Sequence, residues 1–114
     1  MSPQPGKARI EDLPGSETAD RFEGHSAGSS VSVFLSHNTP GTGPPLHAHP
    51  YEETFFVIEG DVLFTIDGVE VEARDGDIVV VPANTPHKFV SRGETHNQFS
   101  IHPVGQMQTT WLEE

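Results

Sequence analysis

The feature that most constrains the fold is a succession of short apolar runs separated by turn residues. Between residues 53 and 81 the runs ETFFVI, DVLFTI and DIVVV alternate with the dipeptides Glu59-Gly60, Asp67-Gly68 and Asp75-Gly76. Runs this short, rich in β-branched and aromatic residues, are typical of strands. Asp and Gly both tolerate the positive φ angles of a two-residue hairpin turn. We therefore predict an all-β protein with hairpins at Glu59-Gly60 and Asp67-Gly68.

Further strands are predicted on both sides of this region, at residues 31–36, 69–73, 87–90 and 98–102. In the first of them Val31, Val33 and Leu35 alternate with a more polar set, which gives the strand one polar-leaning face. The run at residues 77–81 is apolar on both faces and is expected to be central. Residues 37–46 form a Pro- and Gly-rich loop, and Trp111 with Leu112 is expected to anchor the C-terminal tail. About eight short strands at this spacing favour a sandwich or jelly roll.

The length of 114 residues indicates one domain. Residues 1–24 are rich in Pro, Gly and charge and have no hydrophobic period, so we expect a flexible N-terminal arm there and a single domain at residues 25–114. No apolar run in the first 15 residues could serve as a signal-peptide core, and the longest one, at residues 78–81, is too short to cross a bilayer. A soluble protein of the cytoplasm is the expectation.

Charge and cysteine usage exclude several classes of partner and site. Seventeen acidic residues face six basic ones, for a formal net charge of −11. A surface of that sign repels phosphate backbones and anionic headgroups, so neither nucleic acid nor membrane is an expected partner. The chain has no cysteine, which removes disulfides, thiolate metal sites and cysteine nucleophiles.

The placement of the histidines points to a metal. His47 and His49 lie two residues apart, so both side chains share one face of an extended segment. Glu53 has the same parity if the chain stays extended, and His87 comes from another strand. Three imidazoles and a carboxylate suit Fe(II), Mn(II), Ni(II), Co(II), Cu(II) or Zn(II), and four ligands on an octahedral ion leave two positions open, as a catalytic site requires. The alternative is a set of solvated or hydrogen-bonded polar residues without metal.

The spacing around these residues resembles the two signatures of the cupin superfamily. The first is matched at each fixed position, and the second is matched with two departures, Asn84 in place of Gly and Ser91 in place of Asn. The matching positions are Gly41, His47, His49, Glu53 and Gly60 in the first and Gly76, Pro82 and His87 in the second. Asn is the best non-glycine residue for a left-handed backbone. The resemblance implies a small single-domain cupin, a double-stranded β-helix (jelly-roll) barrel at residues 25–114, with His47, His49, Glu53 and His87 holding a metal at its mouth.

Other candidates have ordinary structural interpretations beside functional ones. Glu52 is a possible base but has the opposite parity and is expected to be exposed. Tyr51 could orient a substrate or pack under a loop, and His102 could line the barrel or lie on its rim. Exposed positions are expected for the remaining histidines, His25, His37 and His96. The phenylalanines of the predicted strands could form a pocket floor but are first of all core: Phe55, Phe64 and Phe89.

The number and positions of the basic residues limit the class of substrate. Anionic substrates usually need Arg or Lys partners, and the motif strands carry only Lys88, which points outward, unless Arg9, Arg21 or Arg92 folds over the mouth. We expect a small, mostly neutral substrate bound to the metal, with Glu53 or a hydroxide on the metal as base. The resemblance implies dioxygenase chemistry first and lyase or isomerase chemistry second. The alternatives are a non-catalytic metal-dependent module that binds or senses a small molecule, and a purely structural cupin. The runs at residues 55–58 and 78–81 are apolar on both faces, more than one barrel interior can cover, so a homodimer is expected.

Overall fold

The computed structural model describes residues 6–113, so the first five residues of the predicted arm and Glu114 lie outside the described residues. The described part contains eight strands and two short 3-10 turns and has no α-helix. The strands are β1 (Ala19–Phe22), β2 (Ser32–Ser36), β3 (His47–Ala48), β4 (Glu53–Ile66), β5 (Val69–Arg74), β6 (Ile78–Val81), β7 (His87–His102) and β8 (Thr110–Trp111); the 3-10 turns are η1 (Ile10–Asp12) and η2 (Gly24–Ala27). The all-β prediction is confirmed. No helix within residues 6–113 has the length and apolar character needed to cross a membrane.

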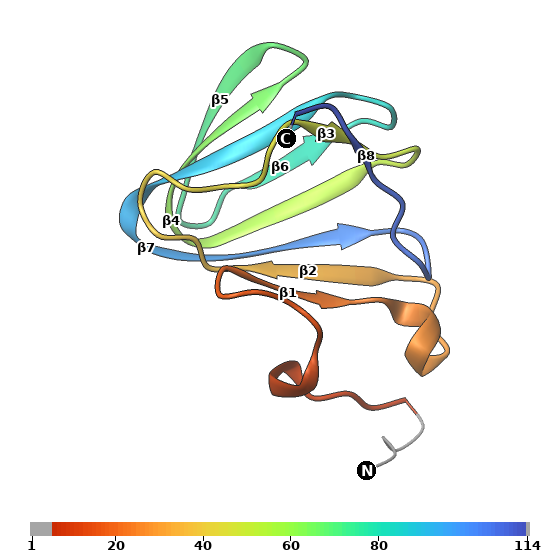
Figure 1. The fold of residues 1–114 in the computed structure, drawn as a ribbon. Helices are drawn as coiled ribbons and strands as arrows, with labels where there is room; N and C mark the ends of the chain where they lie inside the picture. The colour runs from red at the N-terminus through yellow and green to blue at the C-terminus, as the bar shows by residue number, and fades with distance from the viewer. Residues whose placement is uncertain (1–5, 114) are drawn as a thin grey trace.

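All strand pairs are antiparallel, and they form one continuous sheet that curls into two layers (Figure 1). The curl arises because the long strands β4 and β7 run through both layers. One layer has the order β1-β2-β7-β4-β6 and uses the C-terminal half of β7 and the N-terminal half of β4. The other has the order β5-β4-β7-β3-β8 and uses the remaining halves. Two curled layers of this kind are the predicted jelly roll.

The predicted hairpin at Glu59-Gly60 is wrong. The chain continues through these residues as β4, and two register shifts against β7, between Val57 and Glu59 and between Gly60 and Val62, bend the strand instead of reversing it. Such bulges increase the local twist, and Gly60, at φ 145°, adopts the backbone that the bend requires. The predicted strands at residues 87–90 and 98–102 are likewise two halves of β7. The turn at Asp67-Gly68 is confirmed, with φ values of 50° and 78°.

The arm predicted to be flexible contains a strand. Residues Ala19–Phe22 pair with β2, with Phe22 opposite Val33. No hydrophobic period marks this segment because a four-residue strand with one Phe is too short to show one. The division of the chain at residue 24 stays a prediction.

The hydrophobic core lies between the two layers. Phe64 is fully buried, and its ring lies 5.0 Å from that of Phe55 in an edge-to-face arrangement. The buried apolar set is Phe55, Val57, Val62, Phe64, Ala73, Val79, Val81 and Phe89. The core role expected for the three phenylalanines is confirmed. The prediction that residues 77–81 form a central strand is wrong, because β6 pairs only with β4 and its Ile78 and Val80 are exposed.

On the other side of the barrel the polarity of the sheet is reversed. Apart from Phe34, the inward-facing side chains of β2 and of the C-terminal half of β7 are polar, whereas their outward-facing ones are apolar. The buried inner set is Ser32, Ser36, Gln98, Ser100 and His102, and the outer set is Val33, Leu35, Phe99 and Ile101. The barrel therefore has one aromatic inner wall and one polar inner wall, and it presents an apolar surface outside.

Candidate metal centre

The fold brings the four predicted ligand residues together. His47 lies in β3 and pairs directly with His87, the first residue of β7. His49 follows two residues later, and Glu53 begins β4. All four side chains are buried, and one ligand atom from each lies within 4.8 Å of the others. The spacing of the sequence thus translates into a single cluster at one end of the barrel.

Hydrogen bonds fix the tautomer of the three histidines in this cluster. Each donates from Nδ1 to a backbone carbonyl oxygen, which can only accept. The pairs are His47 with Pro45 at 2.7 Å, His49 with Gln108 at 2.7 Å and His87 with Thr85 at 2.8 Å. The proton of each neutral ring therefore sits on Nδ1, and Nε2 is left with the lone pair that a metal requires.

The carboxylate of Glu53 faces these lone pairs. Its Oε1 lies 3.0 Å from His49 Nε2 and 3.1 Å from His87 Nε2. Although His49 Nε2 is buried and close to Glu53, it forms no hydrogen bond with any of the described residues. Neutral imidazole lone pairs and a carboxylate oxygen repel one another at this range, and a cation between them turns the repulsion into coordination. The donor set therefore fits a divalent transition metal.

Burial and contact act in opposite directions on the pKa values of the cluster. For Glu53, burial favours the neutral acid, but the contacts with His102, His49 and His87 outweigh it and hold the pKa of the carboxyl well below its usual range. For His47, burial lowers the pKa to about 4. For His49, burial also lowers the pKa, but the contact with Glu53 and the bond to a carbonyl raise it overall. At neutral pH Glu53 is an anion and His47 is neutral, the states in which both can ligate.

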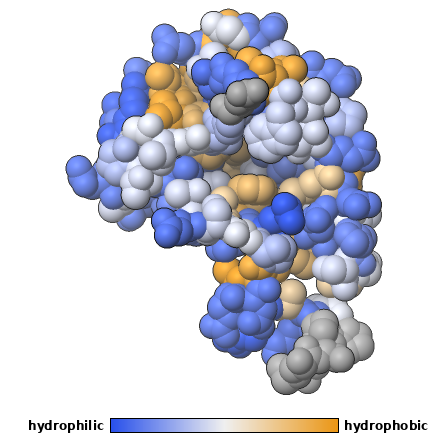
Figure 2. All heavy atoms as spheres, in the orientation of Figure 1, coloured by the Kyte–Doolittle hydropathy of each residue, from blue (hydrophilic) through white to orange (hydrophobic). Residues whose placement is uncertain are grey.

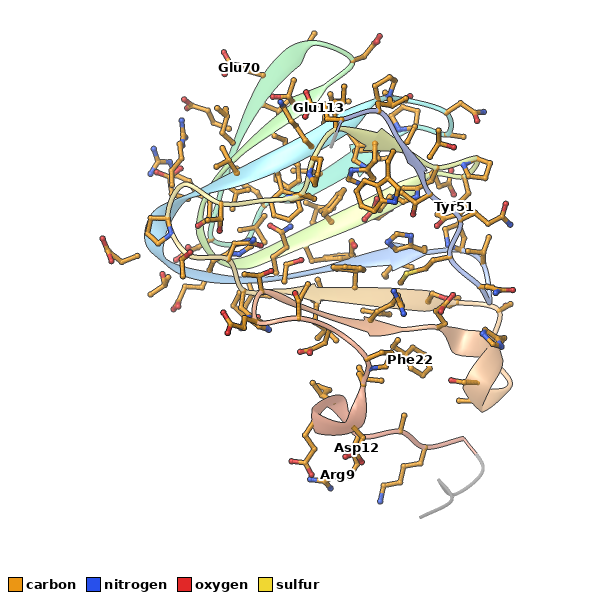
Figure 3. The ribbon with its side chains drawn as sticks, viewed as in Figure 1. Arg9, Asp12, Phe22, Tyr51, Glu70 and Glu113 are labelled. Carbon is orange, nitrogen blue, oxygen red and sulfur yellow. The ribbon has the colours of Figure 1, made fainter. Side chains whose placement is uncertain are left out.

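His102 and Tyr51 adjoin the cluster. His102 is buried, and its Nε2 lies 3.0 Å from the second carboxylate oxygen of Glu53. Its Nδ1 lies 2.8 Å from the hydroxyl of Tyr51, whose ring stacks on that of His49 at 5.0 Å. Tyr51 lies at the end of the barrel where the C-terminal segment crosses (Figure 3). Glu52 is exposed, as expected.

The outer histidines follow the predictions with one exception. His25 and His37 are exposed. His96 is buried, so its predicted exposed position is wrong. The reason is that His96 belongs to β7, where it accepts a hydrogen bond from the backbone N–H of Asn38 at 2.7 Å and lies 3.0 Å from Gln98 Oε1.

The C-terminal segment completes the centre. β8 pairs with β3, Trp111 lies opposite His47, and their rings are 5.1 Å apart. Trp111 thus docks the tail as predicted, although its ring is more than half exposed. The carbonyl of Gln108 that orients His49 belongs to the same segment. No sequence motif marks Gln108, because its contribution is a backbone atom.

The two departures from the signature are accommodated locally. Asn84 has φ 59°, the left-handed conformation expected of a glycine substitute, and its N–H donates to the carbonyl of His49 at 2.7 Å. Ser91 is buried, and its backbone exchanges hydrogen bonds with Gly41 and Thr42 in the loop that precedes His47.

A cavity of about 340 Å³ opens onto the cluster. On the face shown in Figure 2, hydrophilic residues surround a hollow with hydrophobic residues on its wall. His47, His49, Glu53 and His102 line the cavity, and its walls are the aromatic and polar inner walls described above. The principal lining residues are Phe34, Ser36, Phe55, Phe89, Ser100 and Trp111. None of the residues that line it is Lys or Arg.

Comparison with known proteins shows where this architecture occurs. Acireductone dioxygenase of Bacillus mycoides is 33% identical over 94 residues, which are 73% of this chain and 55% of that protein. Quercetin 2,3-dioxygenase of Bacillus subtilis is 43% identical over 44 residues, 38% of this chain and 13% of that protein. The structure of oxalate decarboxylase from Bacillus subtilis superposes with a TM-score of 0.80 at 19% identity over 90% of this chain and 31% of that one. The chain thus spans little more than half the length of these relatives at most.

A family model described as a cupin domain matches residues 34–101, more than half of the chain, including all four residues of the cluster. The matched range coincides with the jelly roll from β2 to the end of β7. This chain belongs to the cupin family.

Proposed function

We propose that this cupin is a metal-dependent enzyme of the dioxygenase type that acts on a small, mostly uncharged substrate. The observation that carries the proposal is the set of three Nε2 lone pairs and one carboxylate at the end of a cavity. His47, His49, Glu53 and His87 would hold the ion. A bound divalent metal supplies Lewis acidity and open coordination positions. The dioxygenases among the relatives favour oxygen chemistry over the lyase or isomerase alternative.

The cavity supports an uncharged substrate. The arginines that could have folded over the mouth are engaged elsewhere: Arg92 bonds to Asp61 at 2.8 Å, Arg21 lies 3.6 Å from Glu23, and Arg9 bonds to Glu11 at 2.8 Å. An anionic group would meet Glu53 without a compensating cation other than the metal. Phe55 and Phe89 offer apolar faces to a planar ring, while Ser36 and Ser100 offer hydroxyls to its oxygens. Phenols and enols fit this combination.

The role of Glu53 as a base is secondary in this proposal. Its lowered pKa makes the carboxylate a weak base before metal binding. Oε1 is directed at the histidine nitrogens and Oε2 at His102. We therefore assign Glu53 first to metal binding and second to proton transfer from the substrate.

The test begins with elemental analysis of protein purified without a histidine tag, followed by oxygen-uptake assays with a panel of enols and phenols. About one equivalent of a first-row metal and metal-dependent oxygen consumption are expected. Metal without oxygen uptake or product, but with ligand binding, would overturn the enzyme and leave the binding or sensing module. Trace metal after reconstitution with Fe, Mn, Ni, Co, Cu and Zn would overturn the metal centre itself.

Bound metal is expected to be lost as the pH falls. A protonated imidazole cannot ligate, and the pKa of His49 is raised from 6.5, so protons compete from near neutral pH downward. His47, with a pKa lowered to about 4, adds a second effect: between 6.5 and about 4 the unfolded chain binds a proton there that the folded chain does not, so the metal-free fold loses stability across this window. Elemental analysis after dialysis in steps from about pH 8 to pH 4 measures the loss, and full retention at pH 4 would contradict histidine ligation.

We also propose that the chain forms a homodimer in the cytoplasm through its apolar outer face. This face consists of two rows across the five strands β1-β2-β7-β4-β6. One row is Leu35, Phe99, Phe56 and Ile78 and ends on β1 at Asp20; the other is Phe22, Val33, Ile101, Thr54 and Val80. Phe56 and Phe99 stack at 4.8 Å, Ile78 and Val80 are more than half exposed, and Phe22 projects from β1 away from the barrel (Figure 3).

A second copy suits this face better than any charged partner, because nine of its side chains are uncharged and the one charged group, Asp20, lies at the β1 edge. Five strands about 4.8 Å apart span about 19 Å from the first strand axis to the last, enough for the apolar centre of a standard interface of about 800 Å² per partner. Two such faces related by a two-fold axis would pack as a β-sandwich.

Val80→Glu is expected to convert this dimer into a monomer. The wild-type chain should elute with light-scattering mass twice the 12.4 kDa of one chain, and the variant with the mass of one. Val69→Glu is the matched control, since Val69 is equally exposed but lies in the β4–β5 hairpin. A monomeric wild-type chain would overturn the dimer.

A further inference from the structure

Four histidines surround Glu53, and one of them is turned the opposite way. His47, His49 and His87 donate from Nδ1 to carbonyl oxygens and leave Nε2 free. His102 has no carbonyl at Nδ1. Its Nδ1 faces the Tyr51 hydroxyl at 2.8 Å, and its Nε2 faces Glu53 Oε2 at 3.0 Å. The partners of His102 therefore call for a different tautomer.

The direction of each hydrogen bond along this chain follows from the groups at its two ends. The backbone N–H of Gln108 lies 3.3 Å from the Tyr51 oxygen and can only donate to it. The hydroxyl proton of Tyr51 is then free to point to His102 Nδ1, which accepts. With Nδ1 accepting, the neutral ring carries its proton on Nε2, where the carboxylate of Glu53 is the acceptor. The hydrogen bonds thus all donate in the same direction, from the backbone N–H of Gln108 through Tyr51 and His102 to Glu53 Oε2.

The two oxygens of Glu53 are thereby given different tasks. Oε1 lies at 3.0 and 3.1 Å from two ring nitrogens of the cluster. Oε2 lies 3.0 Å from Nε2 of His102, which is outside the cluster. The side chains of Tyr51, His102 and Glu53 are all at least half-buried, and the Tyr51 ring is stacked on that of His49. The carboxylate therefore has little freedom to rotate. A carboxylate held in this way offers one oxygen to a metal, not two.

We propose that Tyr51 and His102 are positioning residues that hold Glu53 as a one-oxygen metal ligand and so keep a coordination position open for substrate. The inference rests on the proposed metal centre. In this role both residues act through Glu53 and not as ligands of the metal. Hydrogen bonds to a ligand from outside the coordination sphere commonly change metal affinity by about 10- to 100-fold.

The test uses cobalt(II), whose visible absorption reports ligand number and geometry, in the full chain. His102→Leu removes the donor to Oε2 and is expected to weaken cobalt binding by about 10- to 100-fold and to change the absorption spectrum. His102→Gln places an amide N–H near the same point and should restore most of the affinity and the wild-type spectrum. Tyr51→Phe leaves the tautomer of His102 undetermined and should give an intermediate effect.

His96→Leu is the matched control, because His96 is also buried and has a polar partner at each ring nitrogen, but neither partner is Glu53. It should reduce thermal stability without changing the cobalt affinity or spectrum. Wild-type affinity and spectrum in His102→Leu would overturn the positioning role and leave the metal centre intact. Absence of cobalt binding in the wild-type chain would overturn both. If His102→Leu does not fold, Tyr51→Phe with an unchanged spectrum and affinity overturns the role equally.

Discussion

His49→Ala is expected to purify with only trace metal and to have no metal-dependent turnover. The substitution removes one of three Nε2 ligands and leaves Glu53 Oε1 with only His87 at close range. It also frees the carbonyl of Gln108, so the C-terminal segment loses a hydrogen bond of 2.7 Å. We expect the affinity to fall by at least about 100-fold, which corresponds to about 2.7 kcal/mol. Elemental analysis measures the metal content, and competition with a chelator measures the affinity.

His25→Ala is the control for this variant, because His25 is exposed and belongs neither to the cluster nor to the lining of the cavity. It should retain the wild-type metal content. Circular dichroism must show that His49→Ala keeps its strands, so that the loss of metal reflects ligation. Metal content equal to that of the wild-type chain in a folded His49→Ala protein would contradict the assignment of His49 as a ligand.

Phe64→Ala is expected to destabilise the fold by about 3–5 kcal/mol. Phe64 is fully buried and contacts the rings of Phe55 and Phe89, so its removal leaves a cavity at the centre of the core. A loss of this size is a large share of the stability of a small domain. Denaturant unfolding, followed by circular dichroism, measures it as a shift of the midpoint at unchanged slope.

Val69→Ala removes an apolar side chain that is 62% exposed and should change the stability by less than about 0.5 kcal/mol. A loss below about 1 kcal/mol for Phe64→Ala would show that the core can collapse around the vacated space.

Local patterns predicted the parts of the molecule that depend on neighbours in sequence. The parity of His47 and His49 placed both side chains on one side of the chain, and Asp67-Gly68 specified a hairpin through its backbone preferences. Glu53 joins them although the chain bends at residues 50 and 51 and does not stay extended, the condition on which its parity was predicted. Glu59-Gly60 looked the same as a sequence but became a bulge, because the partner strand β7 continues alongside both halves of β4. Whether a glycine marks a turn or a bend depends on pairing with residues about 40 positions away in the chain.

The surroundings of the cluster of His47, His49, Glu53 and His87 could not be predicted for a related reason. His102 and Gln108 reach the cluster through strand pairing and a backbone carbonyl, neither of which has a spacing rule. The alternation of β2 was visible, but its polar side faces inward, contrary to the usual arrangement, because the interior there is a cavity wall and not packed core.

The position of Trp111 has a practical consequence for studying this protein. It is the only tryptophan of the chain, and its ring lies 5.1 Å from that of His47. Indole emission is quenched by open-shell ions at short range and responds to the charge and polarity of its surroundings. The chain therefore contains an intrinsic fluorophore beside the histidine cluster. Its emission can report metal uptake, removal of the metal by a chelator and binding of a non-fluorescent ligand in real time, without a label.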